Sequence, residues 1–104
     1  MSTADLTVLA LGREELSASE YIAEIQRRLR KQERVRFQMH AMGTSLEGTT
    51  EDILAVVGEL HAVPFEQGVQ RVYTVLKLDE RRDHPDQTLD DKVRSVEDRL
   101  GNDI

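Results

Sequence analysis

Apolar and polar residues alternate along three segments of the chain, residues 5–11, 35–42 and 70–79. A period of two residues is typical of β-strands with one buried face, so each segment is predicted to be a strand. Gly43 permits a tight turn after the second segment, and residues 44–48 are predicted to return as a short paired strand. In the second segment Met39 falls on the same face as Val35, which predicts that Met39 belongs to the core.

Three other segments carry apolar residues at spacings of three and four, which predicts amphipathic helices. Each begins with a hydroxyl residue followed three positions later by an acidic one, the pattern of a helix N-cap. These pairs are Ser17 with Glu20, Thr49 with Asp52, and Thr88 with Asp91. The predicted apolar stripes are Ala18, Ile22, Ile25 and Leu29 in the first helix, Ile53, Val56, Val57, Leu60 and Val63 in the second, and Leu89, Val93, Val96 and Leu100 in the third.

The predicted order of elements is β-α-β-β-α-β-α, and its first six elements match the split βαβ plan. We therefore expect one α+β domain over residues 1–104, a ferredoxin-like sandwich with an added C-terminal helix. One face of the sheet would lie outside the two helices of this plan. It would carry Thr7, Leu9, Arg36, Gln38, His40, Arg71, Tyr73, Val75 and Lys77. Because this mixture is too apolar for a solvated face, a partner sheet, the third helix, or both should cover part of it.

Composition excludes several classes of protein. The chain has no cysteine, so disulfides, thiolate metal sites and cysteine nucleophiles are ruled out. Its net charge of −6 argues against a general nucleic-acid binder, which needs a basic surface. No apolar run approaches the ~18 residues of a membrane span, and the first residues do not look like a signal peptide. We expect a cytoplasmic protein that has no membrane or nucleic-acid partner.

Several short motifs, in this order and spacing, carry a resemblance to a known family. They are Met42-Gly43-Thr44-Ser45-Leu46-Glu47-Gly48, His61 within residues 59–62, and residues 68–72, 77–83 and 92–96. The chain resembles the small single-domain family of thiamine-binding-type proteins from about residue 6 to residue 100. One departure is Ala10-Leu11-Gly12, where the family commonly has Pro-Leu-Gly. The resemblance implies a ferredoxin-like protomer, assembly into dimers or tetramers, and binding of thiamine or its hydroxymethylpyrimidine half, and it implies no reaction.

A site for thiamine needs a carboxylate, an apolar or aromatic wall, and a hydroxyl or amide that orients the ring. With the resemblance, Glu47 is expected to pair with the pyrimidine, while Thr44 and Ser45 orient it. Tyr73 and Met42 are candidates for the wall. Asp79 is a candidate second anionic contact, in the alternating charge run of residues 77–83.

Each candidate also has a structural interpretation. Glu47 could be an incidental surface residue of a Gly-bounded hairpin. Tyr73 could be a contact between copies of the chain, which we favour over a ligand contact. The charge run could be a salt-bridged strand end, and Arg81 within it could instead bind an anion.

Other chemistry finds little support in the residues. His40, His61 and His84 lack metal-ligand spacing, although His40 could join a site, and His61 is expected to be structural. No nucleophile with a positioned base and no phosphate loop is evident, so we expect neither an enzyme, nor a metal site, nor a cofactor. The basic residues between Arg27 and Arg36 are expected to form a solvated helix end. The predicted function is non-catalytic small-molecule binding. The alternative is an oligomeric structural or regulatory module whose open sheet face is an interface.

Overall fold

The computed structural model describes residues 1–12 and 18–101, and within them seven helices and strands follow the predicted order. They are β1 (Ser2–Leu11), α1 (Ala18–Arg30), β2 (Arg36–His40), β3 (Gly43–Gly48), α2 (Thr50–Glu66), β4 (Arg71–Glu80) and α3 (Leu89–Leu100). The predicted caps of α2 and α3 are confirmed, because the Thr49 and Thr88 hydroxyls accept the main-chain N–H of Asp52 and Asp91. The predicted cap at Ser17 lies outside the described residues.

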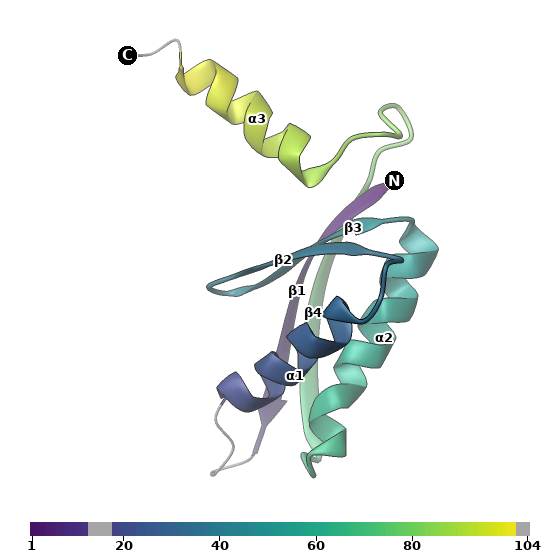
Figure 1. Cartoon of the computed structure of the whole chain (residues 1–104), viewed down its shortest axis with the longest axis vertical. Coiled ribbons are helices and arrows are strands. Elements are labelled where there is room, and N and C mark those ends of the chain that lie inside the picture. The colour runs from purple at the N-terminus through teal and green to yellow at the C-terminus, as the bar shows by residue number, and fades with distance from the viewer. Residues whose placement is uncertain (13–17, 102–104) are drawn as a thin grey trace.

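Four antiparallel strands form one sheet in the order β2-β3-β1-β4. Helices α1 and α2 pack on the same face of this sheet (Figure 1), which confirms the α+β, ferredoxin-like arrangement. Strand β1 pairs with β4 along its whole length, from Ser2 to Leu11. It pairs with β3 only as far as Leu6. The second half of β1 therefore extends beyond the β2–β3 hairpin.

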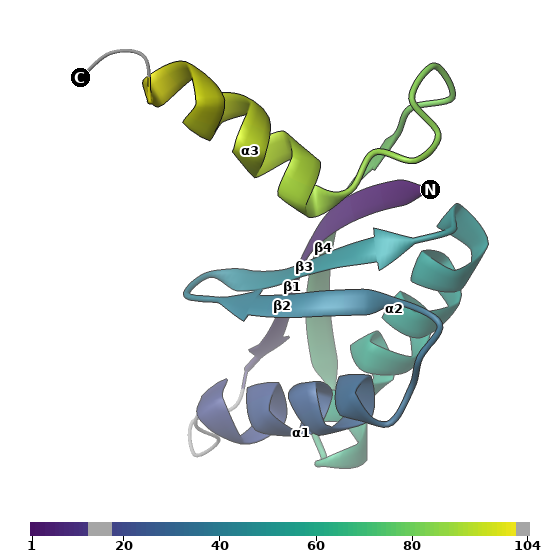
Figure 2. The ribbon, with the colours of Figure 1, turned by 45° about the horizontal axis from the view of Figure 1, so that its top comes forward.

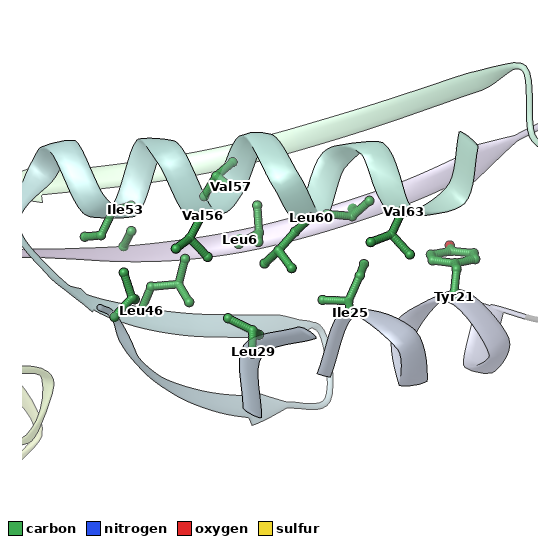
Figure 3. Close-up of a cluster of buried hydrophobic side chains, with 13 residues drawn as sticks. Leu6, Tyr21, Ile25, Leu29, Leu46, Ile53, Val56, Val57, Leu60 and Val63 are labelled. Atoms are coloured by element: carbon green, nitrogen blue, oxygen red, sulfur yellow. The ribbon is translucent and has the colours of Figure 1, made fainter. Parts of the chain in front are cut away.

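The hydrophobic core lies between the sheet and the two helices (Figure 3). Leu6 and Leu46 contribute from the sheet, and the predicted stripe of α2 is confirmed in full, from Ile53 to Val63. In α1 the prediction is only half right. Ile25 and Leu29 are buried as predicted, whereas Ala18 and Ile22 are exposed.

Tyr21 occupies the core position that was predicted for Ile22. Its side chain is only 4% exposed, against 38% for Ile22. The ring packs in the core, and its hydroxyl accepts the main-chain N–H of Ala10 at 3.3 Å. A buried tyrosine needs such a partner, and β1 provides one. The prediction that Met39 is a core residue is wrong, because this side chain is 57% exposed near the tip of the hairpin.

Helix α3 stands away from the rest of the domain and touches it only near its first turn (Figures 1 and 2). Val93, Val96 and Leu100 of its apolar stripe are each 57% exposed. The third helix therefore covers only one end of the open sheet face, and beyond Leu89 the described residues do not bury the predicted stripe. Within the described part of the chain, no helix combines the length and hydropathy that a membrane crossing requires.

Candidate functional site

A cavity of about 350 Å³ lies where the β2–β3 hairpin, α1 and the second half of β1 meet. We call it the hairpin cavity. It is lined by residues 6–9 of β1, residues 39–44 of the hairpin, and Ala18, Tyr21, Ile22, Ile25 and Gln26 of α1. Its volume is near the lower end, about 300 Å³, of the range for small-molecule sites. The exposed side chains of Ile22, Met39 and Met42 are therefore walls of a cavity rather than isolated surface residues.

Gly43 brings the hairpin close to β1 at this point. A Cβ atom at residue 43 would collide with the main-chain oxygen of Leu6 and touch the Thr7 hydroxyl. The Thr7 hydroxyl donates to the Met42 carbonyl at 3.1 Å, so the turn is also fixed by a side chain of β1. The absence of a side chain at residue 43 thus sets the shape of the hairpin cavity.

The polar groups of the hairpin cavity are few and well placed. The Gln26 amide nitrogen donates to the Thr44 hydroxyl oxygen at 2.9 Å, and Thr44 is buried. The Gln26 side-chain oxygen accepts no hydrogen bond from any described residue, which leaves it able to accept one from a ligand. Thr44 and Met42 were predicted from the sequence as site residues, whereas Gln26 and Tyr21 were not. The one available signal was a polar residue four positions after Ile22 in an apolar stripe.

His40 lies at the edge of the hairpin cavity and is held from two sides. Its Nδ1 accepts the main-chain N–H of Met42 at 3.3 Å, and its Nε2 lies 2.7 Å from the Asp5 carboxylate. An accepting Nδ1 places the ring proton on Nε2, which therefore donates to Asp5. His40 thus connects the hairpin cavity with the negative charge of Asp5 on the open face of the sheet.

A second, smaller cavity lies on the open sheet face beside the start of α3, with a volume of about 260 Å³. Its charged and hydroxyl lining residues are Thr3, Asp5, Ser45, Lys77, Asp79 and Lys92. The Lys92 ammonium group donates to the Thr3 hydroxyl at 2.6 Å and to the Asp79 carboxylate at 2.5 Å. Two of the predicted site residues, Ser45 and Asp79, therefore lie in this cavity, apart from Thr44 and Met42.

Glu47 lies in neither cavity, although the sequence made it the leading ligand residue. Its side chain is 5% exposed. One carboxylate oxygen accepts the main-chain N–H of Leu89 at 2.9 Å, and the other lies 3.4 Å from the Arg36 guanidinium. A carboxylate at a helix N-terminus is favourable, because the first N–H groups of a helix have no partner within it. In this chain Glu47 holds the first turn of α3 against the sheet.

Tyr73 also lies outside both cavities, on the open sheet face. It stands opposite Leu9 in the β1–β4 register, and both side chains are exposed. With Val75, they form an exposed apolar patch on the sheet. The charge run of residues 77–83 follows Tyr73 along the chain. It is salt-bridged through Arg82 with Glu80 and through Arg81 with Asp83. The Arg81 guanidinium lowers the pKa of Asp83 to about 2.

Among the described residues, no three His, Asp or Glu side chains are grouped so that they could hold a metal ion. His61 instead pairs with the Thr74 hydroxyl at 2.6 Å and packs edge-on against Phe65.

The domain is thus an α+β sheet with two helices on one face and a small, mostly apolar cavity at its hairpin. The model of one family, described as thiamine-binding protein, matches residues 4–97, and the chain belongs to this family. The family description names binding and no reaction.

Named relatives span nearly the whole chain. The UPF0045 protein YqgV of Bacillus subtilis is 36% identical over 103 residues, covering 96% of this chain and 98% of the relative. A UPF0045 protein of Methanothermobacter thermautotrophicus is 41% identical and covers 96% and 100% of the two chains.

Solved structures share the fold. The hypothetical protein MJ1052 of Methanocaldococcus jannaschii is 30% identical, with a TM-score of 0.78 over 91% of this chain and 94% of that one. A Thermotoga maritima protein named as a candidate thiamine biosynthesis/salvage protein is 23% identical, with a TM-score of 0.74 over 91% and 97%. At this lower identity the likeness establishes the fold alone.

Proposed function

We propose that this protein binds thiamine, or its hydroxymethylpyrimidine half, in the hairpin cavity and catalyses no reaction on it. The observation that carries the proposal is the Gln26–Thr44 pair inside a mostly apolar cavity. Small-molecule sites combine apolar walls with a small number of polar groups that fix the orientation of the ligand. The family description supports thiamine as the ligand.

Each part of thiamine has a complementary group around the hairpin cavity. The Thr44 hydroxyl and the Gln26 amide orient the pyrimidine. Met42 and Met39 supply polarisable walls, since thioether sulfur packs favourably against aromatic rings. His40 at the cavity edge is hydrogen-bonded to the Asp5 carboxylate, and the negative charge of Asp5 offsets the positive charge of the thiazolium. In this proposal Glu47, Ser45, Tyr73 and Asp79 do not touch the ligand.

Isothermal titration calorimetry of the purified protein with thiamine tests the proposal. We expect one site per chain, with weaker binding in Gln26→Met, which keeps the length of the side chain but removes its amide. Glu97→Gln is the matched control, because Glu97 is exposed on α3, far from the cavity. Absence of heat with millimolar thiamine, in protein shown to be folded and ligand-free, would refute the proposal.

The exposed stripe of α3 favours a second role, in which the chain assembles with copies of itself as a dimer or tetramer. The radius of gyration is 15.6 Å, against roughly 13 Å for a compact domain of this length. The larger radius reflects α3, which projects away from the rest of the domain. The open face carries a matching apolar patch at Leu9, Tyr73 and Val75, so a second copy could cover both surfaces. We place this assembly in the cytoplasm.

A further inference from the structure

One edge of β1 borders the hairpin cavity without a neighbouring strand. The pairing of β1 with β3 ends at Leu6 opposite Thr44, whereas its pairing with β4 continues to Leu11. From Thr7 onward, the edge of β1 that faces the hairpin has no strand partner within the described residues. Residues 7–9 of this strand are also part of the cavity lining.

The parity of the strand identifies which main-chain groups point to this edge. The Leu6 carbonyl lies against Gly43 of the hairpin, and the Ala10 N–H bonds to the Tyr21 hydroxyl instead of to β4. Main-chain groups of a strand alternate between its two edges, so Val8, midway between Leu6 and Ala10, points the same way. The Val8 N–H and C=O thus face the hairpin side, and no hydrogen bond joins them to any described loop or side chain.

A strand residue in this position offers a donor and an acceptor side by side. Their complement is a planar ring that has an acceptor nitrogen next to an amino group. The 4-aminopyrimidine half of thiamine has this edge, whereas its thiazolium ring has no N–H donor. Main-chain N–H and C=O groups are among the polar groups that commonly fix ligands in small-molecule sites.

We infer that the main chain of Val8 recognises the aminopyrimidine edge of the ligand, an inference that rests on the proposed function and specifies it. Gln26 of α1 and Thr44 of β3 line the same cavity and complete the polar contacts. The amino group then decides affinity, because without it the Val8 carbonyl is left in an apolar cavity without a donor. The positive charge of the thiazolium contributes less.

Calorimetry with three compounds tests the inference on the unmodified protein. They are thiamine, 4-amino-5-hydroxymethyl-2-methylpyrimidine, and the same pyrimidine with a methyl group in place of the amino group. We expect the aminopyrimidine to bind and its methyl analogue to bind at least about tenfold more weakly, the loss of one buried hydrogen bond. If thiamine binds and the two pyrimidines bind equally well, or neither binds, the inference is wrong and the proposed function stands. If none of the three binds, both are wrong.

A variant provides an independent measurement. Val8→Pro removes the main-chain N–H. The β1–β4 pairing does not use this group, because the main-chain groups of Val8 point to the other edge of β1. We expect this variant to bind the aminopyrimidine and its methyl analogue each about tenfold more weakly, because both compounds accept the Val8 N–H at the ring nitrogen. Val8→Ala keeps both main-chain groups and should keep the affinity for both compounds within a few-fold. An undiminished affinity for the aminopyrimidine in folded Val8→Pro would overturn the inference, and the compound series decides the question if this variant does not fold.

Discussion

The Glu47 carboxylate on β3 accepts the main-chain N–H of Leu89, the first residue of α3, at 2.9 Å. This contact joins the sheet to a helix that follows it by some forty residues and that otherwise projects away from the domain (Figure 2). With the bonds of Lys92 to Thr3 and Asp79, it fixes where α3 leaves the sheet. Glu47, which the family resemblance predicted as a ligand contact, therefore stabilises the position of α3 in this chain.

Glu47→Ala should release α3. The substitution leaves the Leu89 N–H without its acceptor, which we expect to cost about 1–3 kcal/mol of stability. Hydrogen–deuterium exchange in residues 89–100 should rise, while thiamine affinity stays within about twofold. Glu97→Ala on the same helix is the control and should change neither. A large loss of affinity with unchanged exchange in α3 would assign Glu47 to the ligand instead.

Gly43→Ala should disturb the hairpin cavity. The new methyl group would meet the Leu6 carbonyl, so the hairpin has to move away from β1. We expect a destabilisation of about 1–3 kcal/mol, as for other overpacked sites, together with weaker thiamine binding. Gly58→Ala is the matched control, since nothing lies within 4 Å of its added Cβ atom, and alanine in a helix should stabilise α2 by about 1 kcal/mol. Chemical denaturation measures both changes.

Stability should fall in acid through Glu80. Hydrogen bonds from Thr50 and Arg82 lower the pKa of Glu80 from 4.5 to about 2. A lowered pKa in the folded state means that the unfolded chain takes up the proton first, so stability is present above pH 4.5 and is lost as the pH falls toward 2. Capping bonds to Thr88 lower the pKa of Asp91 and act in the same direction. Melting temperatures of Glu80→Gln should depend less on pH in this window, and an unchanged slope would contradict the assignment.

Val96→Asp should weaken self-association. The change puts a charge into the exposed apolar stripe of α3, where the domain alone loses nothing by it. Native mass spectrometry should show dimers or tetramers for the unmodified chain and mainly monomers for the variant. Arg99→Gln, outside the stripe, changes the net charge by the same amount and is the control. A chain that is monomeric before any substitution would exclude the assembly role.

The sequence was sufficient for features that depend on local periodicity. The stripe of α2 from Ile53 to Val63 was predicted residue by residue, because a helix buried on one side shows this pattern directly. It was insufficient where the rotation or position of an element decides. Tyr21 instead of Ile22 faces the core because its hydroxyl reaches β1, a contact that local spacing does not show.

The candidate site was predictable in part for the same reason. The hairpin residues Thr44 and Met42 were found, because the motif that carries the family resemblance lies on one short segment. Gln26 was not, because it reaches the hairpin cavity from a different element. The structural role of Glu47 was not predictable, because its partner Leu89 lies far along the chain.

The affinity of Gln26→Met for thiamine, compared with that of the unmodified chain, tests the central claim most directly. If the ligand occupies the hairpin cavity, calorimetry should show a single site whose affinity falls by roughly tenfold when the Gln26 amide is removed, the loss expected for a buried hydrogen bond. The variant should melt within a few degrees of the unmodified protein. Equal affinities for the two proteins would place the ligand elsewhere and contradict the account.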